Sequence, residues 1–279
     1  MPELPEVETL RRSLLPHVIG QTIVAVRPGA FPAIMGEHGV AAGAARIVGR
    51  TIVRLRRRGK YLLLDLDNEM TLMVHLRMTG NLLAVPRSTP PLRFEHLALE
   101  LDSGIDLRYA DQRKFGRVIP LLPVDVRHLQ RRLGPEPLSR RFTAARLQSA
   151  LARRPGKIKS VLLDQRLVAG LGNIYVDEAL FRARIHPERG AHDLSKHEVS
   201  RLHRAIRMVL REGLLRRGTT FSSFHDAAGE AGENQANLRV YGRGVEAPCL
   251  RCGQPLNQIV VGGRGTTYCP RCQPRDVVP

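Results

Sequence analysis

Four cysteines near the C-terminus constrain this chain more than any other feature. They form two Cys-x2-Cys pairs separated by sixteen residues: Cys249, Cys252, Cys269 and Cys272. Two pairs at this spacing can place four thiolates tetrahedrally around one Zn²⁺. Because four thiolates leave no open coordination position, we expect a structural metal. A disulfide or redox role is the less favoured alternative, since no cysteine lies elsewhere in the chain.

The residues between the two cysteine pairs predict a β-hairpin. Residues 258–261 and 266–268 have strand character, and the run Gly262-Gly263-Arg264-Gly265 supplies the turn. We therefore predict a zinc ribbon over residues 239–274. Arg264 would project at its glycine-rich tip, where a cation can hold a phosphate or simply remain solvated.

The net charge indicates the kind of partner. The 279 residues include 44 Lys+Arg against 26 Asp+Glu, a net charge of +18 at pH 7. Such a surface attracts a polyanion, most commonly nucleic acid, although a solvated basic face or ribosome binding would also explain it. Only five of the basic residues are lysine. Lysine can release a proton near its working pH whereas arginine cannot, so Lys60 and Lys159 attract interest.

The chain shows no sign of a membrane or secretory destination. It contains no apolar run of the roughly 18 residues that a membrane-spanning helix needs. Its first residues are acidic where a signal peptide would be basic. We expect a cytoplasmic protein.

Residues 1–122 predict a helix followed by an antiparallel β-sandwich or barrel. Pro5 and Glu6 suit a first helical turn, and later apolar residues share one face. Runs with β-branched or alternating character then recur between short polar breaks. They are residues 22–26, 51–55, 61–66, 71–76, 94–101, 105–109 and 117–121.

The pattern changes from strand to helix near Val124. Residues 127–133 and 142–154 have helical spacing, and a capping box at Ser195–Glu198 opens a long amphipathic helix to about residue 215. We therefore predict a helical domain over residues 127–238, within an α+β, multi-domain fold. Residues 221–237 have weak periodicity and predict a mobile loop or lid.

The first residues could carry chemistry. Removal of Met1 would leave Pro2 with a secondary amine, whose pKa near ~8 leaves a useful fraction unprotonated at neutral pH. Such an amine can attack an electrophilic carbon and become a cationic iminium. Glu3 beside it could move protons. A disordered terminus without function is the alternative.

Short motifs recur along nearly the whole chain. They are residues 2–8, 58–61, 75–80, 111–116, 163–165, 170–175 and 240–243, together with the four-cysteine ribbon. In this order they resemble the bacterial formamidopyrimidine-DNA glycosylase family, also called MutM. Leu4 stands where the related endonuclease VIII-like enzymes usually have glycine, which favours the purine-lesion branch.

The resemblance implies a fold and an activity. The fold would be a β-sandwich with the opening helix, a helix–two-turn–helix domain and the zinc ribbon, with DNA bound in the cleft between domains. The activity would be that of a monomeric bifunctional DNA glycosylase/AP lyase of base excision repair. It would remove oxidised purines (8-oxoguanine and formamidopyrimidines) from double-stranded DNA containing a damaged base, through an N-terminal proline iminium, and would cut the strand by β,δ-elimination. It would use one structural Zn²⁺ and no redox or organic cofactor. An oxidised-pyrimidine glycosylase and a non-catalytic zinc-ribbon DNA-binding protein are the alternatives.

The resemblance also implies roles for particular residues. Pro2 and Glu3 would be catalytic, with Lys60 as an acid–base group and Arg264 stabilising a phosphate charge or donating a proton. Arg77 stands where many relatives have glycine before the residue that enters the duplex. The implied DNA contacts are His75, Met78, His96, Arg113, Phe115, Lys159 and Asn173.

Overall fold

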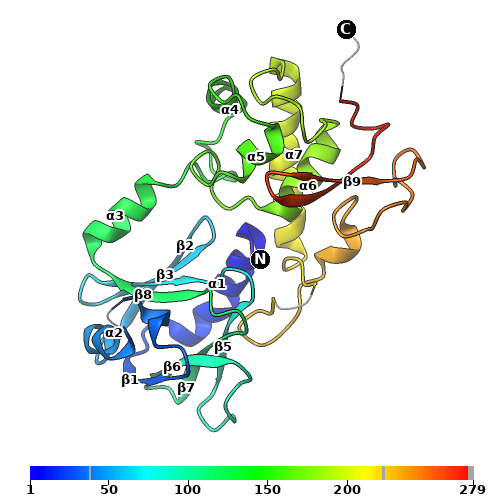
Figure 1. Cartoon of the computed structure of the whole chain (residues 1–279). Coiled ribbons are helices and arrows are strands. Elements are labelled where there is room, and N and C mark those ends of the chain that lie inside the picture. The colour runs from blue at the N-terminus through cyan, green and yellow to red at the C-terminus, as the bar shows by residue number, and fades with distance from the viewer. Residues whose placement is uncertain (38, 222–223, 276–279) are drawn as a thin grey trace. The chain divides into compact units, whose positions relative to one another are not determined.

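The chain forms two compact units in the computed structural model, which describes residues 1–37, 39–221 and 224–275 (Figure 1). The first unit comprises Met1–Arg131 and Leu214–Glu233; the second comprises Arg132–Gly213 and the chain from Asn234 onward. The sequence pattern placed residues 214–233 within a helical domain at 127–238. In the structure this segment returns to the first unit.

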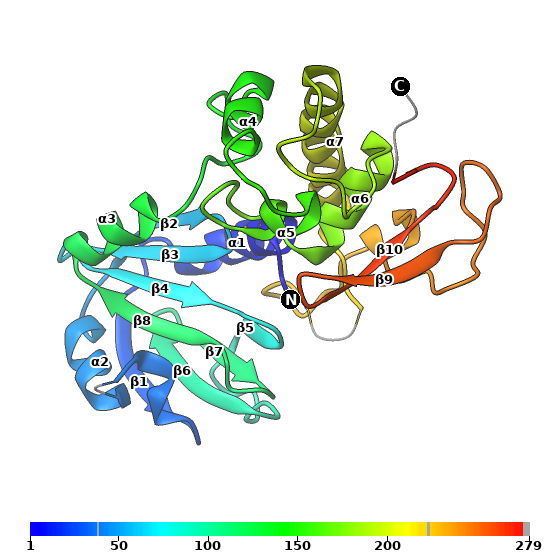
Figure 2. The same cartoon turned by 45° about the horizontal axis from the view of Figure 1, so that its top comes forward.

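The first unit is a sandwich of two four-stranded antiparallel sheets, as predicted. One sheet has the strand order β1-β6-β7-β5 and the other β2-β3-β4-β8, and Figure 2 shows the second sheet in that order. The strands are β1 (Ile23–Pro28), β2 (Ile52–Arg58), β3 (Tyr61–Leu66), β4 (Thr71–His75), β5 (Gly80–Pro86), β6 (Glu95–Leu101), β7 (Ile105–Asp111) and β8 (Arg117–Leu121).

Helix α1 (Leu4–Val18) contributes its apolar face to the core of this sandwich. Leu10, Leu14 and Val18 are fully buried in the same cluster as the inward-facing strand residues. The sequence pattern predicted this helix but missed strand β5, the 3-10 helix η1 (Pro32–Met35) and helix α2 (Gly39–Ile47). β5 was missed because its burial follows no clean two-residue alternation.

The returning segment is bonded to the sandwich. Phe224 and Ala227 belong to the sandwich core. Ala84 of β5 donates its N–H to the carbonyl of Ala227 (2.9 Å), and Ala227 donates its own N–H to Ser13 Oγ of α1 (3.0 Å). We expected a mobile loop over residues 221–237. Residues 222 and 223 lie outside the described residues, whereas Ala227 is bonded to α1 and β5.

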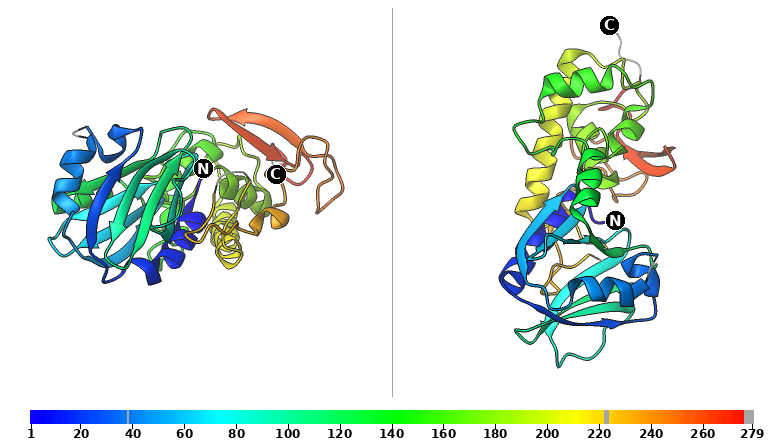
Figure 3. Two further views of the ribbon diagram at one scale, coloured as in Figure 1. Left: turned by 90° about the horizontal axis from the view of Figure 1, so that it is seen from below. Right: turned by 90° about the vertical axis from the view of Figure 1, so that its left-hand side faces the viewer.

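The second unit is helical and carries the hairpin. Its helices are α4 (Ala144–Leu151), α5 (Ile158–Leu163), α6 (Asn173–Ala183) and α7 (Lys196–Leu215), and its hairpin strands are β9 (Asn257–Val261) and β10 (Arg264–Tyr268). The predicted capping box of α7 is present: Glu198 N–H donates to Ser195 Oγ (3.2 Å) and Ser195 N–H to Glu198 Oε2 (2.8 Å). Strand β10 packs against α6, and Figure 3 shows the hairpin beside the helices of this unit.

Two helix boundaries differ from the predicted ones. Helix α3 (Pro123–Arg131) starts at a proline before the predicted residue 127, in keeping with the preference of proline for a first turn. Helix α4 is shorter than the predicted 142–154: it starts after Thr143, whose side chain caps it by accepting from Arg146 N–H, and it ends at Leu151. No helix within the described ranges is both long and apolar enough to cross a membrane.

Candidate active site and metal centre

Pro2 and Glu3 are buried at the start of α1. Glu3 is the N-cap residue of α1, and its side chain is only 2% exposed. Its backbone N–H donates to Glu6 Oε2 (2.8 Å). Glu6 is itself buried, and its other oxygen accepts the backbone N–H of Thr219 (2.8 Å). One carboxylate therefore joins the first residues of the chain to the returning segment.

Position 218, next to the same carboxylate, requires glycine. Its φ is +84°, a left-handed conformation that favours glycine, and an added Cβ would lie 2.9 Å from Glu6 Oε1. The sequence pattern assigned Glu6 only to the helix start. Its contact with Thr219 spans 213 positions of sequence, so no local pattern could reveal it.

Lys60 lies in the tight turn between β2 and β3. Gly59 adopts a φ of +57° there, and Lys60 is only 5% exposed. Arg57 supports the turn because it donates to the carbonyl of Gly59 (2.9 Å) and pairs with Glu8 of α1 (3.1 Å). A lysine this buried does not belong to a solvated basic face, which was the alternative explanation of the net charge.

Met78, Arg113 and Phe115 lie on two neighbouring loops that one carboxylate organises. The loops precede β5 and follow β7, which pair with Gly80 opposite Asp111. Asp111 is 1% exposed and accepts hydrogen bonds from Thr79 Oγ1, from Arg113 N–H (3.1 Å) and from Gly116 N–H (2.7 Å). Asp111 therefore fixes both loops at once.

The second of these loops presents an aromatic ring to solvent. Phe115 is 49% exposed, and the Arg113 guanidinium carbon lies 4.7 Å from its ring centroid. Gly116 must be glycine, since an added Cβ would lie 1.6 Å from the Tyr109 hydroxyl. An exposed ring beside a cation, on a loop fixed from below, is suited to contact a base.

The two candidate histidines are buried. His75 Nδ1 accepts the backbone N–H of Arg77 (3.1 Å), and burial, with the charges of Arg77 and Lys60, lowers the pKa of His75 to about 3. His96 donates from Nε2 to the carbonyl of Asp111 (2.8 Å). His75 is therefore neutral at physiological pH, and both rings support loops that carry candidate contacts. Arg77 has a φ of +54°, a left-handed conformation that favours glycine.

Lys159 is the centre of a buried polar cluster in the second unit. Its side chain has no exposed surface, and its Nζ pairs with Asp177 Oδ1 (2.6 Å). The same ammonium donates to Thr266 Oγ1 (2.7 Å) and to the carbonyl of Gly265 (3.0 Å). Burial raises the pKa of Asp177 to about 7, against the opposing effect of Lys159. Any contribution of Lys159 to a DNA contact would therefore be indirect, through the hairpin that it holds.

The hairpin turn is tied to the start of α6. Asn173 is the first residue of α6, and its Nδ2 also donates to the carbonyl of Gly265 (3.0 Å). The turn consists of Gly262 and Gly263, with φ values of +59° and +71°, so Arg264 is the first residue of β10 rather than part of a four-residue tip. Arg264 is exposed next to the anchored Gly265.

Glu178 anchors the chain that leads into the ribbon. Its carboxylate accepts the backbone N–H groups of Arg239, Val240 and Tyr241, each at 2.9 Å. Three such hydrogen bonds compensate a side chain that is only 4% exposed. The sequence pattern gave no role to Glu178 or to Asp177. Both lie on a helix whose other buried residues are mostly apolar.

The four cysteines cluster as predicted. Their Sγ atoms all lie within 4.8 Å of one another, with 3.9 Å between Cys249 and Cys272 and 3.6 Å between Cys252 and Cys269. Disulfide sulfurs would lie near ~2.05 Å. A tetrahedral Zn²⁺ with Zn–S bonds near 2.3 Å needs sulfur separations of about 3.8 Å. The sulfur atoms therefore fit a four-thiolate structural zinc site.

Comparisons with known proteins agree with this architecture along the chain. Residues 1–118 match the family described as Formamidopyrimidine-DNA glycosylase N-terminal domain. Residues 133–225 match Formamidopyrimidine-DNA glycosylase H2TH domain, and residues 247–275 match Zinc finger found in FPG and IleRS. The formamidopyrimidine-DNA glycosylase of Herpetosiphon aurantiacus is 49% identical over 273 residues, covering 98% of this chain and all of the relative.

Solved structures agree as well. A Lactococcus lactis Fpg in complex with DNA containing an abasic site has a TM-score of 0.91 and 37% identity, covering 98% of this chain and 99% of that one. The MutM (FPG) protein from Thermus thermophilus has a TM-score of 0.88 and 42% identity, covering 99% of this chain and all of that one.

The β-sandwich that opens on Pro-Glu, the helical unit and the four-thiolate hairpin define a class of zinc-ribbon DNA glycosylases. The chain belongs to the formamidopyrimidine-DNA glycosylase family and is an enzyme of that family.

Proposed function

We propose that this enzyme is a bifunctional DNA glycosylase/AP lyase that removes oxidised purines from duplex DNA. The observation that supports this proposal is the position of Pro2 and Glu3. Glu3 is the buried N-cap residue of α1 and is bonded to Glu6, and this arrangement holds Pro2, the candidate nucleophile, in a defined place. The named relatives and the Lactococcus lactis complexes with Fapy-dG or abasic-site DNA support the substrate class. The net charge of +18 suits a duplex partner.

The chemistry starts from the secondary amine that removal of Met1 creates on Pro2. The target nucleotide is flipped out of the duplex, because its sugar carbon is otherwise inaccessible. The proline nitrogen forms a bond to C1′, the bond from C1′ to the base breaks, and the base leaves with a proton. Loss of the amine proton and opening of the sugar ring give the iminium, with Glu3 protonating the ring oxygen.

The iminium then drives strand cleavage. It acidifies the proton on C2′, and removal of that proton expels the 3′ phosphate in β-elimination; a second elimination expels the 5′ phosphate. Lys60 serves as the acid–base group of the first elimination, which suits an ammonium of little exposure. Arg264 stabilises phosphate charge, since guanidinium hardly deprotonates.

The remaining candidates position the duplex. Met78, Arg113 and Phe115 fill the space left by the extruded nucleotide, and an apolar insertion offsets an unstacking cost of a few kcal/mol. Asn173 lies at a helix start, where backbone N–H groups favour phosphate. His75, His96 and Lys159 support these contacts from beneath the surface.

The experiment that tests the proposal is covalent trapping by borohydride on a duplex containing 8-oxoguanine. The active protein should begin at Pro2, form a trapped adduct and cut the strand. Pro2→Gly should keep DNA binding but lose most base excision. The control Pro5→Ala should keep base excision, since Pro5 never carries a free amine. Intact Met1 in the active protein, or equal excision by Pro2→Gly, would contradict catalysis by the proline amine.

The substrate branch is tested separately. Cleavage of an 8-oxoguanine duplex should exceed cleavage of an otherwise identical thymine-glycol duplex. The reverse preference would assign the enzyme to oxidised pyrimidines, and trapping on neither duplex would leave only a DNA-binding protein.

A further inference from the structure

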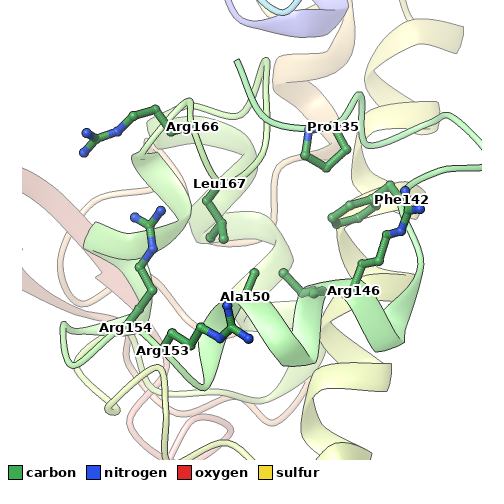
Figure 4. Close-up of a pocket in the computed structure, with 9 residues that line it drawn as sticks. Pro135, Phe142, Arg146, Ala150, Arg153, Arg154, Arg166 and Leu167 are labelled. Atoms are coloured by element: carbon green, nitrogen blue, oxygen red, sulfur yellow. The ribbon is translucent and has the colours of Figure 1, made fainter. Parts of the chain in front are cut away.

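The second unit has a pocket that the proposed chemistry does not use. It lies beside α4 and has a volume of 370 Å³, and its apolar floor is made by Phe142, Leu147 and Leu167. Figure 4 shows Phe142 and Leu167 at this pocket. These three side chains are at most 5% exposed and belong to the unit's apolar interior. We call this hollow the α4 pocket. Its volume falls within the range of ligand pockets, at the lower end.

Arginines surround this apolar floor. Arg146, Arg153, Arg154 and Arg166 line the pocket, and Figure 4 shows Leu167 and Ala150 between Arg154 and Arg153 on one side and Arg146 on the other. Asp164 pairs with Arg154 (2.6 Å) and with Arg166 (3.1 Å). One carboxylate for four guanidinium groups leaves the rim strongly positive.

Among the arginines of this rim, Arg153 is the one available to bind an external group. It is exposed, and within the described ranges its guanidinium enters no hydrogen bond or ion pair. Arg146, by comparison, donates to the carbonyl of Arg141 (3.0 Å). An unpaired cation at the edge of an apolar hollow is available to an external anion.

The hollow continues along α4. A second pocket of 410 Å³ shares Arg146, Ala150 and Arg153 with the first and adds Ala145 and Ser149. Arg146 and Ala150 lie one turn apart on α4, and Arg153 follows just beyond its last residue, so both hollows adjoin α4 and its C-terminal end. A short extended or helical segment, rather than a single small molecule, suits two adjoining hollows.

The chemistry of the surface favours a protein segment over nucleic acid. Phosphate contacts need donors and gain nothing from a floor of aliphatic and aromatic side chains. Phe142 cannot offer its face to a base, because it is 3% exposed and packs at 5.0 Å against the ring of His203. An apolar side chain in the hollow with carboxylates at the guanidinium rim would satisfy both halves of the site.

From this charge complementarity we propose that the α4 pocket is a docking site for an acidic protein segment with a central large apolar side chain. The apolar side chain enters the hollow over Leu167 and Phe142, and flanking carboxylates pair with Arg153 and Arg146. The site would connect the repair enzyme to a partner protein without using Pro2, the loops fixed by Asp111 or the zinc ribbon.

The test measures fluorescence anisotropy of a labelled synthetic peptide, Gly-Asp-Glu-Asp-Leu-Phe-Asp-Glu-Gly, with the full-length protein. Arg153→Glu and Ala150→Glu should each weaken binding by about tenfold, since one reverses the rim charge and the other fills the hollow. Ala150 is partly exposed on α4 and Arg153 is exposed just after it. Glutamate is compatible with a helix, so both variants should fold. The matched control is Arg211→Glu, an equal charge change on α7, which should leave binding within twofold.

Two further peptides separate specific docking from general attraction. Replacing Leu-Phe by Ser-Ser, or the acids by Asn and Gln, should each lower affinity by about tenfold. Equal binding of the Ser-Ser peptide, or equal weakening by Arg211→Glu, would overturn the proposal in favour of unspecific electrostatics. If Arg153→Glu and Ala150→Glu weakened binding of an undamaged duplex but not of the peptide, the pocket would be a DNA contact and the proposal would be wrong.

Discussion

The two units hold their candidate contact residues by different means. In the first unit, Asp111 fixes two surface loops through hydrogen bonds that stay within two adjoining strands and their loops. In the second unit, Lys159 and Asp177 tie a hairpin to two helices through a buried ion pair, and the thiolates brace the hairpin from its other end. The loops of the sandwich are positioned by the sheet to which they belong. The hairpin is held by the buried Lys159–Asp177 pair and by the cluster of four cysteines, which fits a metal site.

Loss of zinc should produce the largest difference in unfolding between the two units. Structural zinc supplies apparent binding energies of roughly 10–16 kcal/mol in small zinc modules, so the ribbon should unfold without it. Hydrogen exchange after chelation should rise over residues 249–272 and stay unchanged in the β-sandwich, and duplex binding should weaken. Unchanged duplex binding after verified metal loss would show that the ribbon does not contribute to it.

Lys159→Met should be the most damaging single substitution in the second unit. It leaves the Asp177 carboxylate buried without its cation, which typically costs about 3–5 kcal/mol. Removal of the cation raises the pKa of Asp177 further, so the Asp177 carboxylate should become protonated more readily. Protonation removes the buried charge, and the substitution should therefore lower the free energy of unfolding less at pH 5.5 than at pH 8. Urea unfolding at both pH values checks this. Lys157→Met is the control, since Lys157 is exposed; an equal loss there would exclude a clamp by Lys159.

Asp111→Asn should damage the first unit less and more locally. The amide keeps the shape of the side chain but replaces an acceptor by a donor facing Gly116 N–H, at a cost of about 1–3 kcal/mol. Exchange of the Arg113 and Gly116 amides should accelerate, and lesion-duplex affinity should fall. Asp102→Asn offers a comparison, because Asp102 accepts Thr22 N–H (3.1 Å) at an exposed turn. Equal effects of both would argue against a special role for Asp111.

His75 should make the first unit sensitive to acid. Its pKa is lowered from 6.5 to about 3 on folding, so the unfolded chain takes up the proton first. The stabilisation is therefore complete above pH 6.5 and is lost as the pH falls towards 3. Between pH 6 and 4 the wild type should lose up to about 1.4 kcal/mol per pH unit more than His75→Gln. Parallel stability curves for the two proteins would show that His75 is not neutral when folded.

Arg77→Gly should change the free energy of unfolding least of these substitutions, and it should raise it rather than lower it. The residue has a φ of +54°, which costs a side chain roughly 1–2 kcal/mol relative to glycine. Thermal unfolding should show a gain of about 1 kcal/mol, offset in part by the entropy of the unfolded glycine. A loss of stability would mean that the exposed Arg77 side chain contributes more than its strained backbone costs.

Much of the fold followed from sequence because its signals are periodic or spaced. Strands rich in branched residues, the α7 capping box and the Cys-x2-Cys pairs each carry a local pattern. Strand β5 was missed because it alternates poorly, and α2 because its short alanine- and glycine-rich run has few apolar anchors.

The polar contacts of the site could not be predicted from the sequence, because their partners lie far apart along the chain. Thr79 and Asp111 lie 32 positions apart, and Lys159 and Thr266 lie 107 apart. Side chains that cap distant backbone groups follow no period, so only the fold brings them together. The positions of the candidates were found through motifs, whereas the burial of His75, His96 and Lys159 was not foreseen.

The return of Leu214–Glu233 to the first unit bears on how this protein is made. Phe224 and Ala227 complete the sandwich interior, so a nascent chain that has emerged only to residue 131 lacks part of it. Such a chain must wait for most of the second unit to be translated before its own interior closes. We therefore expect a fragment ending at residue 131 to aggregate on the ribosome or in expression, and neither unit to be obtainable as one uninterrupted stretch of sequence.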